Sequence, residues 1–191
     1  MPHTSRSSRW VWASMAVAVC AAVPTSASTI LPADFRATVT QATVIVRGRV
    51  TDVRAVRSVA GEVETVATVA VEATLKGDAR AFVSMRMPGG TIGRYRTVMP
   101  GAPRVEVGET GVFFLKAAPG GTLWPVGLSS GIYRVTTTGG RALVTPPILP
   151  GVTTATTGIV RRGDTRRKLL PLSEFESLVA LVLNGARAGS R

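Results

Sequence analysis

The most restrictive feature of the sequence is a two-residue period that runs without interruption from Val63 to Lys76. Small or apolar side chains occupy every odd position of this segment, whereas the charged residues Glu64, Glu72 and Lys76 all stand at even positions. Successive side chains of a strand point to opposite faces of a sheet, so this alternation predicts one long strand with a buried face and a face in water. A strand of this kind requires neighbours, and the chain is therefore expected to be rich in β-structure.

Similar alternation on both sides of this segment predicts further strands, separated by turns rich in glycine and proline. In the first of them, 44–55, the apolar phase flips after Asp52, which indicates a bulge or a bend. The segment 111–117 holds a continuous apolar run, typical of a strand that is buried on both faces. The other predicted strands are 83–87, 92–99, 122–128, 131–137 and 141–145.

The carboxy-terminal part of the chain has a different character. Residues 146–170 are rich first in proline and threonine and then in basic residues, which predicts an irregular connection. Ser173 and Glu176 have the spacing of a capping box, and a helix is predicted over 171–186. Because so short a helix is not stable alone in water, we expect its apolar stripe to dock on the barrel or on a partner. The stripe consists of Phe175, Leu178, Val179 and Val182.

These patterns together predict a mainly β fold. Short strands between such turns, with a long bent first strand, favour a small antiparallel barrel of about five to seven strands, of the oligonucleotide/oligosaccharide-binding (OB) type. The barrel domain is expected over residues 32–145. Helical spacing of Phe35, Val39 and Ala42 adds a short helix at its amino-terminal end, within 32–42.

Residues 1–27 have the pattern of a secretory signal peptide: two arginines, an apolar stretch at 10–23, and small residues up to Ala27. A transmembrane helix needs about 20 apolar residues, so an uncleaved anchor is the less favoured alternative. A lipoprotein signal would make Cys20 the lipidated residue, but bulky Val19 stands where a small residue is expected. We therefore predict cleavage after Ala27 and an exported protein, periplasmic or secreted.

The predicted cleavage restricts the chemistry that remains. The sequence contains one cysteine and one histidine, Cys20 and His3, and both lie in the predicted signal peptide. A mature chain without them has no disulfide, no histidine or cysteine ligand for a metal, and no Ser-His or Cys-His catalytic pair. We accordingly expect no metal and no cofactor.

The charge balance permits an anionic partner. Lysine and arginine number 23 against 11 acidic residues, a net charge of +12. Such a surplus suits a glycan, a lipid surface or a nucleic acid, although an arginine-rich composition also follows from a GC-rich genome. Aromatic residues make up only 5% of the chain, which disfavours a nucleic-acid partner because single strands need stacking surfaces. The basic run at 161–168 is interpreted as a solvated linker, with an anionic surface as the alternative.

The strongest candidate for anion binding is the glycine-rich segment 88–93 with its basic neighbours. Its glycines suit a tight loop with positive φ angles, and such a loop can turn backbone N–H groups toward an anion. The segment lacks the Gly-Lys-Ser/Thr ending of a P-loop. The candidate ligand-binding residues are Arg86, Gly89, Gly90, Gly93, Arg94, Tyr95, Arg96 and Arg104.

Two patterns that can signal catalysis have simpler structural interpretations. Residues 127–131 match G-x-S-x-G, but a nucleophile elbow requires a following helix and a histidine, and here a strand is predicted to follow. Acid/base chemistry needs two carboxyl groups whose pKa values are driven apart in a cleft, whereas the paired carboxylates here fall at turns and at a helix start. We therefore predict no catalytic residue. The pairs are Glu62 with Glu64, Glu106 with Glu109, and Glu174 with Glu176.

Five short motifs also follow one another in a recognisable order. They are VRGRV at 46–50, LKGD at 75–78, PGGTIG at 88–93, PGAP at 100–103 and VGE at 107–109. In this the chain resembles a group of uncharacterised exported bacterial proteins, which in turn resemble the barrel of netrin modules and of tissue inhibitors of metalloproteinases. The resemblance covers roughly residues 35–135 and implies an OB-like barrel. It transfers no mechanism. Those inhibitors chelate the protease zinc through a cysteine-bearing amino terminus, and the predicted mature chain has no cysteine.

The residues and the resemblance together predict an exported, non-enzymatic binding or interaction domain. Its expected partner is another exported protein, and the resemblance suggests a protease that it binds or inhibits. The alternative is an electrostatic binder of anionic glycan or lipid headgroups, acting through Arg86, Arg94, Arg96 and Arg104. A hydrolase that uses carboxylate chemistry is the least favoured of the three.

Overall fold

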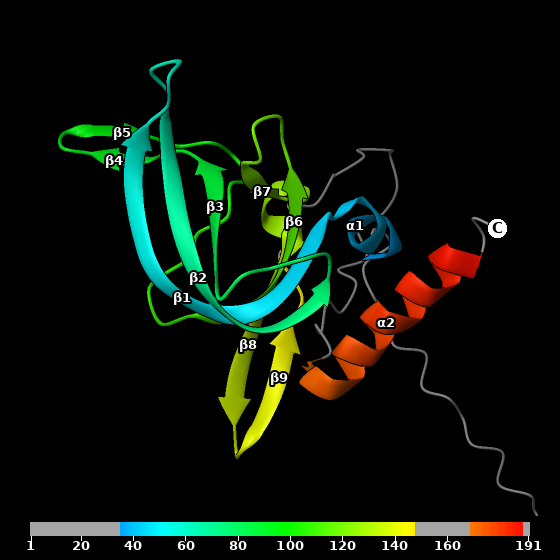
Figure 1. Cartoon of the computed structure of the whole chain (residues 1–191). Helices are drawn as coiled ribbons and strands as arrows, with labels where there is room; N and C mark the ends of the chain where they lie inside the picture. Colours follow the sequence, from blue (N-terminus) through cyan, green and yellow to red (C-terminus); the bar gives the residue numbers. More distant parts are fainter. Residues whose placement is uncertain (1–34, 148–168, 189–191) are drawn as a thin grey trace, which may run out of the picture.

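The computed structural model describes residues 35–147 and 169–188, and shows a mainly β fold with one short and one long helix (Figure 1). The predicted signal peptide 1–27 and the basic run 161–168 lie outside the described residues. So does most of the predicted connection 146–170.

Five strands close into the predicted OB-like barrel. They are β1 (Val44–Arg57), β2 (Val63–Lys76), β3 (Phe82–Pro88), β6 (Thr110–Ala117) and β7 (Leu123–Pro125). Their order is β1-β2-β3-β7-β6, and β6 pairs back with β1. The strand β3 is parallel to β7, whereas the other pairs in the ring are antiparallel. One parallel pair is unavoidable, because strand directions cannot alternate all the way around a ring with an odd number of strands.

The long first strand bends so that it can pair with two neighbours. β1 pairs along its length with β2, and its first half also pairs with β6. The register with β2 shifts between Val50 and Asp52, which confirms the bulge predicted from the phase flip. Gly48 lies in the bent half, where a Cβ atom would collide with the Ala70 carbonyl of β2. The close approach of the two backbones therefore requires a glycine at this position.

The predicted single strand at 92–99 is wrong. The chain instead forms a separate hairpin of β4 (Gly90–Ile92) and β5 (Tyr95–Thr97), with Ile92 opposite Tyr95. The turn falls at Gly93, whose φ of +57° is in the left-handed region that favours glycine. Alternation on either side of so short a turn looks like one strand in the sequence.

Three further strands extend the sheet beyond β6: β8 (Ile132–Thr138), β9 (Arg141–Thr145) and β10 (Leu170–Pro171). The predicted strand at 122–128 ends early, at Pro125, and the 3-10 helix η1 (Leu128–Gly131) leads from it into β8. Leu170 was predicted to end the irregular connection, but it lies in β10 opposite Val144 of β9. This pairing brings the carboxy-terminal segment back to the sheet.

Both predicted helices are present on one side of the barrel (Figure 1): α1 (Phe35–Gln41) and α2 (Leu172–Ala188). The stripe of α2 docks on the barrel, since Phe175, Val179 and Val182 are buried and Leu178 is partly buried. The predicted capping box is wrong, because Ser173 lies within the helix and the Glu176 carboxylate accepts a hydrogen bond from Arg47 of β1. Neither helix is long and apolar enough to cross a membrane.

Two hydrophobic cores result, and β6 separates them. Phe113 and Leu115 of β6 face the inside of the barrel, where they join a core built from β1, β2 and β3. Val112 and Phe114 face the opposite way, into the core beneath the two helices. The continuous apolar run predicted at 111–117 is thus confirmed as a strand buried on both faces. The helices cover the barrel on this side, and the β1–β2 turn and the β4–β5 hairpin lie at its other end (Figure 1).

Candidate functional site

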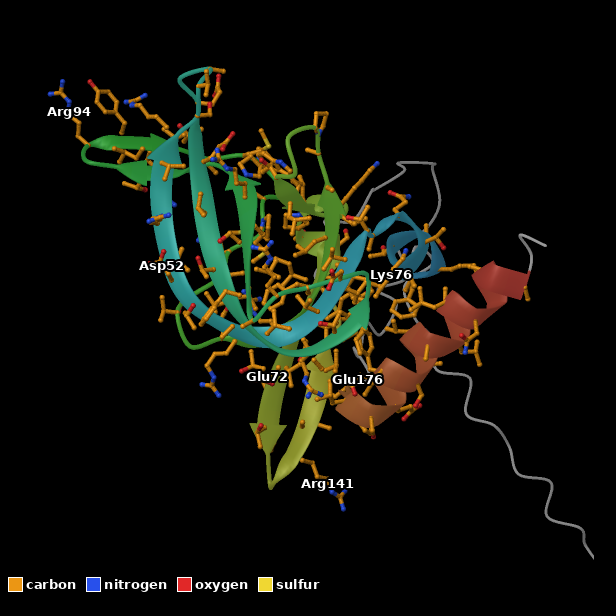
Figure 2. All side chains as sticks on the ribbon, viewed as in Figure 1. Asp52, Glu72, Lys76, Arg94, Arg141 and Glu176 are labelled. Carbon is orange, nitrogen blue, oxygen red and sulfur yellow. The ribbon has the colours of Figure 1, made fainter. Side chains whose placement is uncertain are left out.

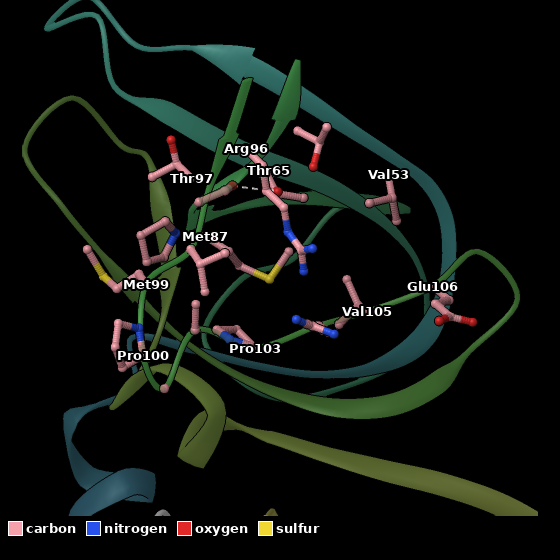
Figure 3. A pocket seen from close by; sticks show the side chains of 18 residues that line it. Val53, Thr65, Met87, Arg96, Thr97, Met99, Pro100, Pro103, Val105 and Glu106 are labelled. Carbon is pink, nitrogen blue, oxygen red and sulfur yellow. Dashed lines mark hydrogen bonds between the residues drawn. The ribbon is translucent and has the colours of Figure 1, made fainter. Parts of the chain in front are cut away.

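A cleft lies at the end of the barrel where β3 leads into the β4–β5 hairpin (Figure 3). Its volume is about 480 Å³. Val53 and Met87 of the barrel line it together with residues of the hairpin and of the loop at 98–106. The hydroxyl of Thr65 on β2 donates a 2.7 Å hydrogen bond to the Gly89 carbonyl and so ties the hairpin to the barrel.

Two guanidinium groups belong to this cleft. Arg96 points from β5 into its centre (Figure 3), and Arg104 comes from the loop before β6. Both are exposed, and neither side chain has a hydrogen-bond or ion-pair partner among residues 35–147 and 169–188. Glu106 is the acidic residue of the lining. The lining of the cleft therefore carries an excess of positive charge.

The glycines of this segment serve the backbone geometry. Gly89 and Gly90 have φ angles of +87° and +148°, as the sequence predicted. A Cβ atom on Gly89 would lie 2.9 Å from the Thr97 carbonyl oxygen, closer than such contacts allow. The N–H group of Gly89 donates to the Val63 carbonyl at 2.9 Å, so it is not available to an anion.

The predicted binding residues separate into three places. Gly89, Gly90, Arg96 and Arg104 line the cleft. Gly93, Arg94 and Tyr95 lie at the turn of the hairpin, outside the lining (Figure 2), where the Arg94 guanidinium stands 5.2 Å from the centre of the Tyr95 ring. Arg86 lies on the outer face of β3.

A second cleft of about 410 Å³ contains Arg86 on the outer face of β1, β2 and β3. Arg86 is bound to Glu64 at 2.8 Å, so its charge is already compensated. Arg54 and Arg57 of β1 share this cleft and were not among the predicted residues. Arg54 could have been placed on the outer face from its alternation with the apolar residues that follow the bulge.

The paired carboxylates mostly hold the fold together. Glu109 binds Arg134 at 3.2 Å, and Glu176 binds Arg47 at 2.7 Å, as Glu64 binds Arg86. No group of three acidic, histidine or cysteine side chains able to hold a metal occurs in the described part of the chain. The G-x-S-x-G segment forms the 3-10 turn between β7 and β8, so the helix that a nucleophile elbow needs does not follow it.

Lys76, at the end of β2, also has a structural position. Its ammonium group donates to the carbonyls of Val39 and Thr40, at 2.9 and 3.0 Å, and so satisfies the carboxy-terminal end of α1. Partial burial lowers the pKa of Lys76. Lys76 therefore lies beside α1 (Figure 2) and does not line the cleft.

Fold and site together define the class: a closed OB-like barrel with an arginine-lined cleft at its loop-bearing end. No protein-family model, no curated protein and no solved structure matches this chain. The argument for function therefore rests on the cleft itself.

Proposed function

We propose that the protein is a non-enzymatic binding domain that holds an anionic group of its ligand between Arg96 and Arg104. The observation that carries this proposal is the pair of unpartnered guanidinium groups in one cleft whose lining includes a single carboxylate. A guanidinium group presents a planar fork of donors that matches a phosphate, sulfate or carboxylate group in two parallel hydrogen bonds. The ligand chemistry is accordingly that of an oxyanion.

The surroundings of the cleft favour a ligand with several anionic groups over a single small ion. Arg94 at the hairpin turn and Arg57 on the outer face extend the positive charge around this end, whereas Asp52 compensates the charge of Arg54 at 3.8 Å. All three arginine side chains are exposed. Contacts with exposed charges are weak one by one, so useful affinity requires several of them at once. An anionic glycan or a surface of lipid headgroups meets this requirement.

The test is calorimetric titration with a short heparin oligosaccharide as the probe. Arg96→Ala and Arg104→Ala should each weaken binding about fivefold, which corresponds to the loss of about 1 kcal/mol for an exposed charge contact. Binding should also weaken as salt rises, since exposed charges are screened. Arg141→Ala is the matched control, because Arg141 is an exposed arginine at the far tip of the β8–β9 hairpin (Figure 2). Heparin affinity of Arg96→Ala and Arg104→Ala equal to that of Arg141→Ala would contradict the proposal.

Interaction with an exported protein such as a protease stays a prediction that rests on the resemblance. Recovery of a reproducible partner from the periplasm or medium would support it, and loss of that partner in Arg96→Ala would place its contact at the same cleft.

A further inference from the structure

The loop-bearing end of the barrel also exposes large apolar side chains. Eight such residues are exposed in the described chain, and four of them lie on the β1–β2 turn, on β5 or directly after it: Val59, Tyr95, Val98 and Met99. Val59 is fully exposed at the β1–β2 turn, and Val98 is 64% exposed. Isolated exposed apolar residues are common, but several on neighbouring loops mark an interaction site.

The two loops that carry these residues are neighbours. The guanidinium of Arg57, at the end of β1, stands 5.8 Å from the centre of the Tyr95 ring in β5. Figure 1 shows the β1–β2 turn and the β4–β5 hairpin projecting from the same end of the barrel, away from α1 and α2. A flat surface that meets this end would therefore touch both loops.

Basic side chains surround the apolar ones. Arg57, Arg94, Arg96 and Arg104 come from these loops and their flanks. Of the acidic residues there, Glu64 and Glu109 are paired with Arg86 and Arg134, which leaves Glu62 and Glu106. Tyrosine and arginine both place an apolar body beside a polar group, and they suit the boundary between lipid tails and headgroups. Exposed aliphatic residues beside a cluster of arginines combine the two attractions that hold a protein on an anionic bilayer.

We propose that this end of the barrel docks on the surface of an anionic lipid bilayer. Val59, Val98 and Met99 enter the boundary of the acyl chains, and Arg94, Arg96 and Arg104 bind lipid phosphate groups. The proposal rests on the proposed function, since Arg96 and Arg104 supply the anion contacts, and it names the source of the anions. A soluble glycan would leave Val59 in water, whereas a bilayer would remove all three aliphatic side chains from it.

The experiment is co-sedimentation with vesicles, using the chain that begins after the predicted cleavage site at Ala27. Binding is expected to phosphatidylcholine vesicles that contain phosphatidylglycerol and not to vesicles of phosphatidylcholine alone. The double variant Val59→Ser, Met99→Ser should bind the anionic vesicles at least tenfold more weakly. Leu181→Ser is its control, because Leu181 is 65% exposed on α2, on the opposite side of the barrel. Arg94→Ala should weaken vesicle binding about fivefold, as expected for one arginine at an anionic surface.

The outcomes separate this inference from the proposed function. Heparin binding that depends on Arg96, without vesicle binding, would leave the proposed function in place and overturn the bilayer as the partner. Equal vesicle binding by the double variant and by Leu181→Ser would overturn the insertion of the loops. If the unmodified protein bound neither heparin nor anionic vesicles, both proposals would be overturned. A complex with an exported protein that depends on Val59, in the absence of vesicle binding, would assign this end to a protein partner.

Discussion

Replacement of Phe175 by alanine tests whether α2 is an integral part of the fold. Phe175 is fully buried, and its ring contacts the rings of Phe35, Phe114 and Tyr133, with centroid distances of 5.5, 6.3 and 4.9 Å. These four rings join α1, β6, β8 and α2, and every pair of them is in contact. The substitution therefore removes the group through which α2 touches all three other elements.

The expected loss is about 3–5 kcal/mol in the free energy of unfolding, the usual cost of truncating a buried phenylalanine. The value should lie in the upper part of this range, because three aromatic contacts are lost in addition to buried area. Leu178→Ala should cost less than the ~2–5 kcal/mol of a fully buried leucine, because Leu178 is only partly buried. A domain of this size has a total stability of about 5–15 kcal/mol, so the Phe175 variant remains measurable.

Urea unfolding followed by circular dichroism measures both quantities. The midpoint should fall strongly for Phe175→Ala while the slope is unchanged, which indicates a change in stability and not in compactness. Leu181→Ala is the control on the same helix, since it is exposed and should change stability by less than about 0.5 kcal/mol. If the free energy of unfolding of Phe175→Ala lay within about 1 kcal/mol of that of the unmodified protein, the docked helix would be refuted, because truncation of a buried phenylalanine costs about 3–5 kcal/mol.

Three further substitutions test particular contacts by the same unfolding measurement. Gly48→Ala should lower the free energy of unfolding by about 3 kcal/mol, the upper end of the usual cost of overpacking, because the new Cβ collides with the Ala70 backbone. A neutral result would contradict the close approach of β1 and β2. Glu176→Gln should cost about 1 kcal/mol through loss of the half-buried pair with Arg47, and high salt should reduce the difference. Lys76→Met should cost about 1–3 kcal/mol through loss of two charge-assisted hydrogen bonds. Because burial lowers the pKa of Lys76, the unfolded chain binds more protons between the folded and the unfolded pKa; stability should rise with pH in that alkaline window, and the rise should vanish in Lys76→Met.

Regular alternation made most of the strands predictable. The bounds of β2 and β9 match the predicted segments 63–76 and 141–145, because each strand has a clear period and a turn at its end. The bulge near Asp52 was visible for the same reason. The β4–β5 hairpin was missed, because alternation continues across a two-residue turn and only the backbone angle of Gly93 reveals it.

The capping box illustrates a different limit. Ser173 and Glu176 have a spacing that local rules assign to a helix start, but the Glu176 carboxylate binds Arg47, which is far away in the sequence. A contact of that kind depends on the closed barrel and on where α2 docks. The same limit applies to the candidate site. The sequence shows which residues are arginines, but which of them share a cleft depends on the loops that the fold brings together.

The distribution of ion pairs adds the last step to the argument about this site. A net charge of +12 says nothing about where the surplus lies. In the fold, Glu64, Glu109 and Glu176 each compensate an arginine of the barrel. Arg96 and Arg104 gain no such partner in the described structure, although Glu106 lines the same cleft. Unpaired arginines also occur elsewhere in the described structure, at Arg141 for example, but that residue lines neither of the two clefts described above. The combination of a cleft, free guanidinium groups and exposed apolar loops at one end therefore points to binding there more strongly than the charge alone.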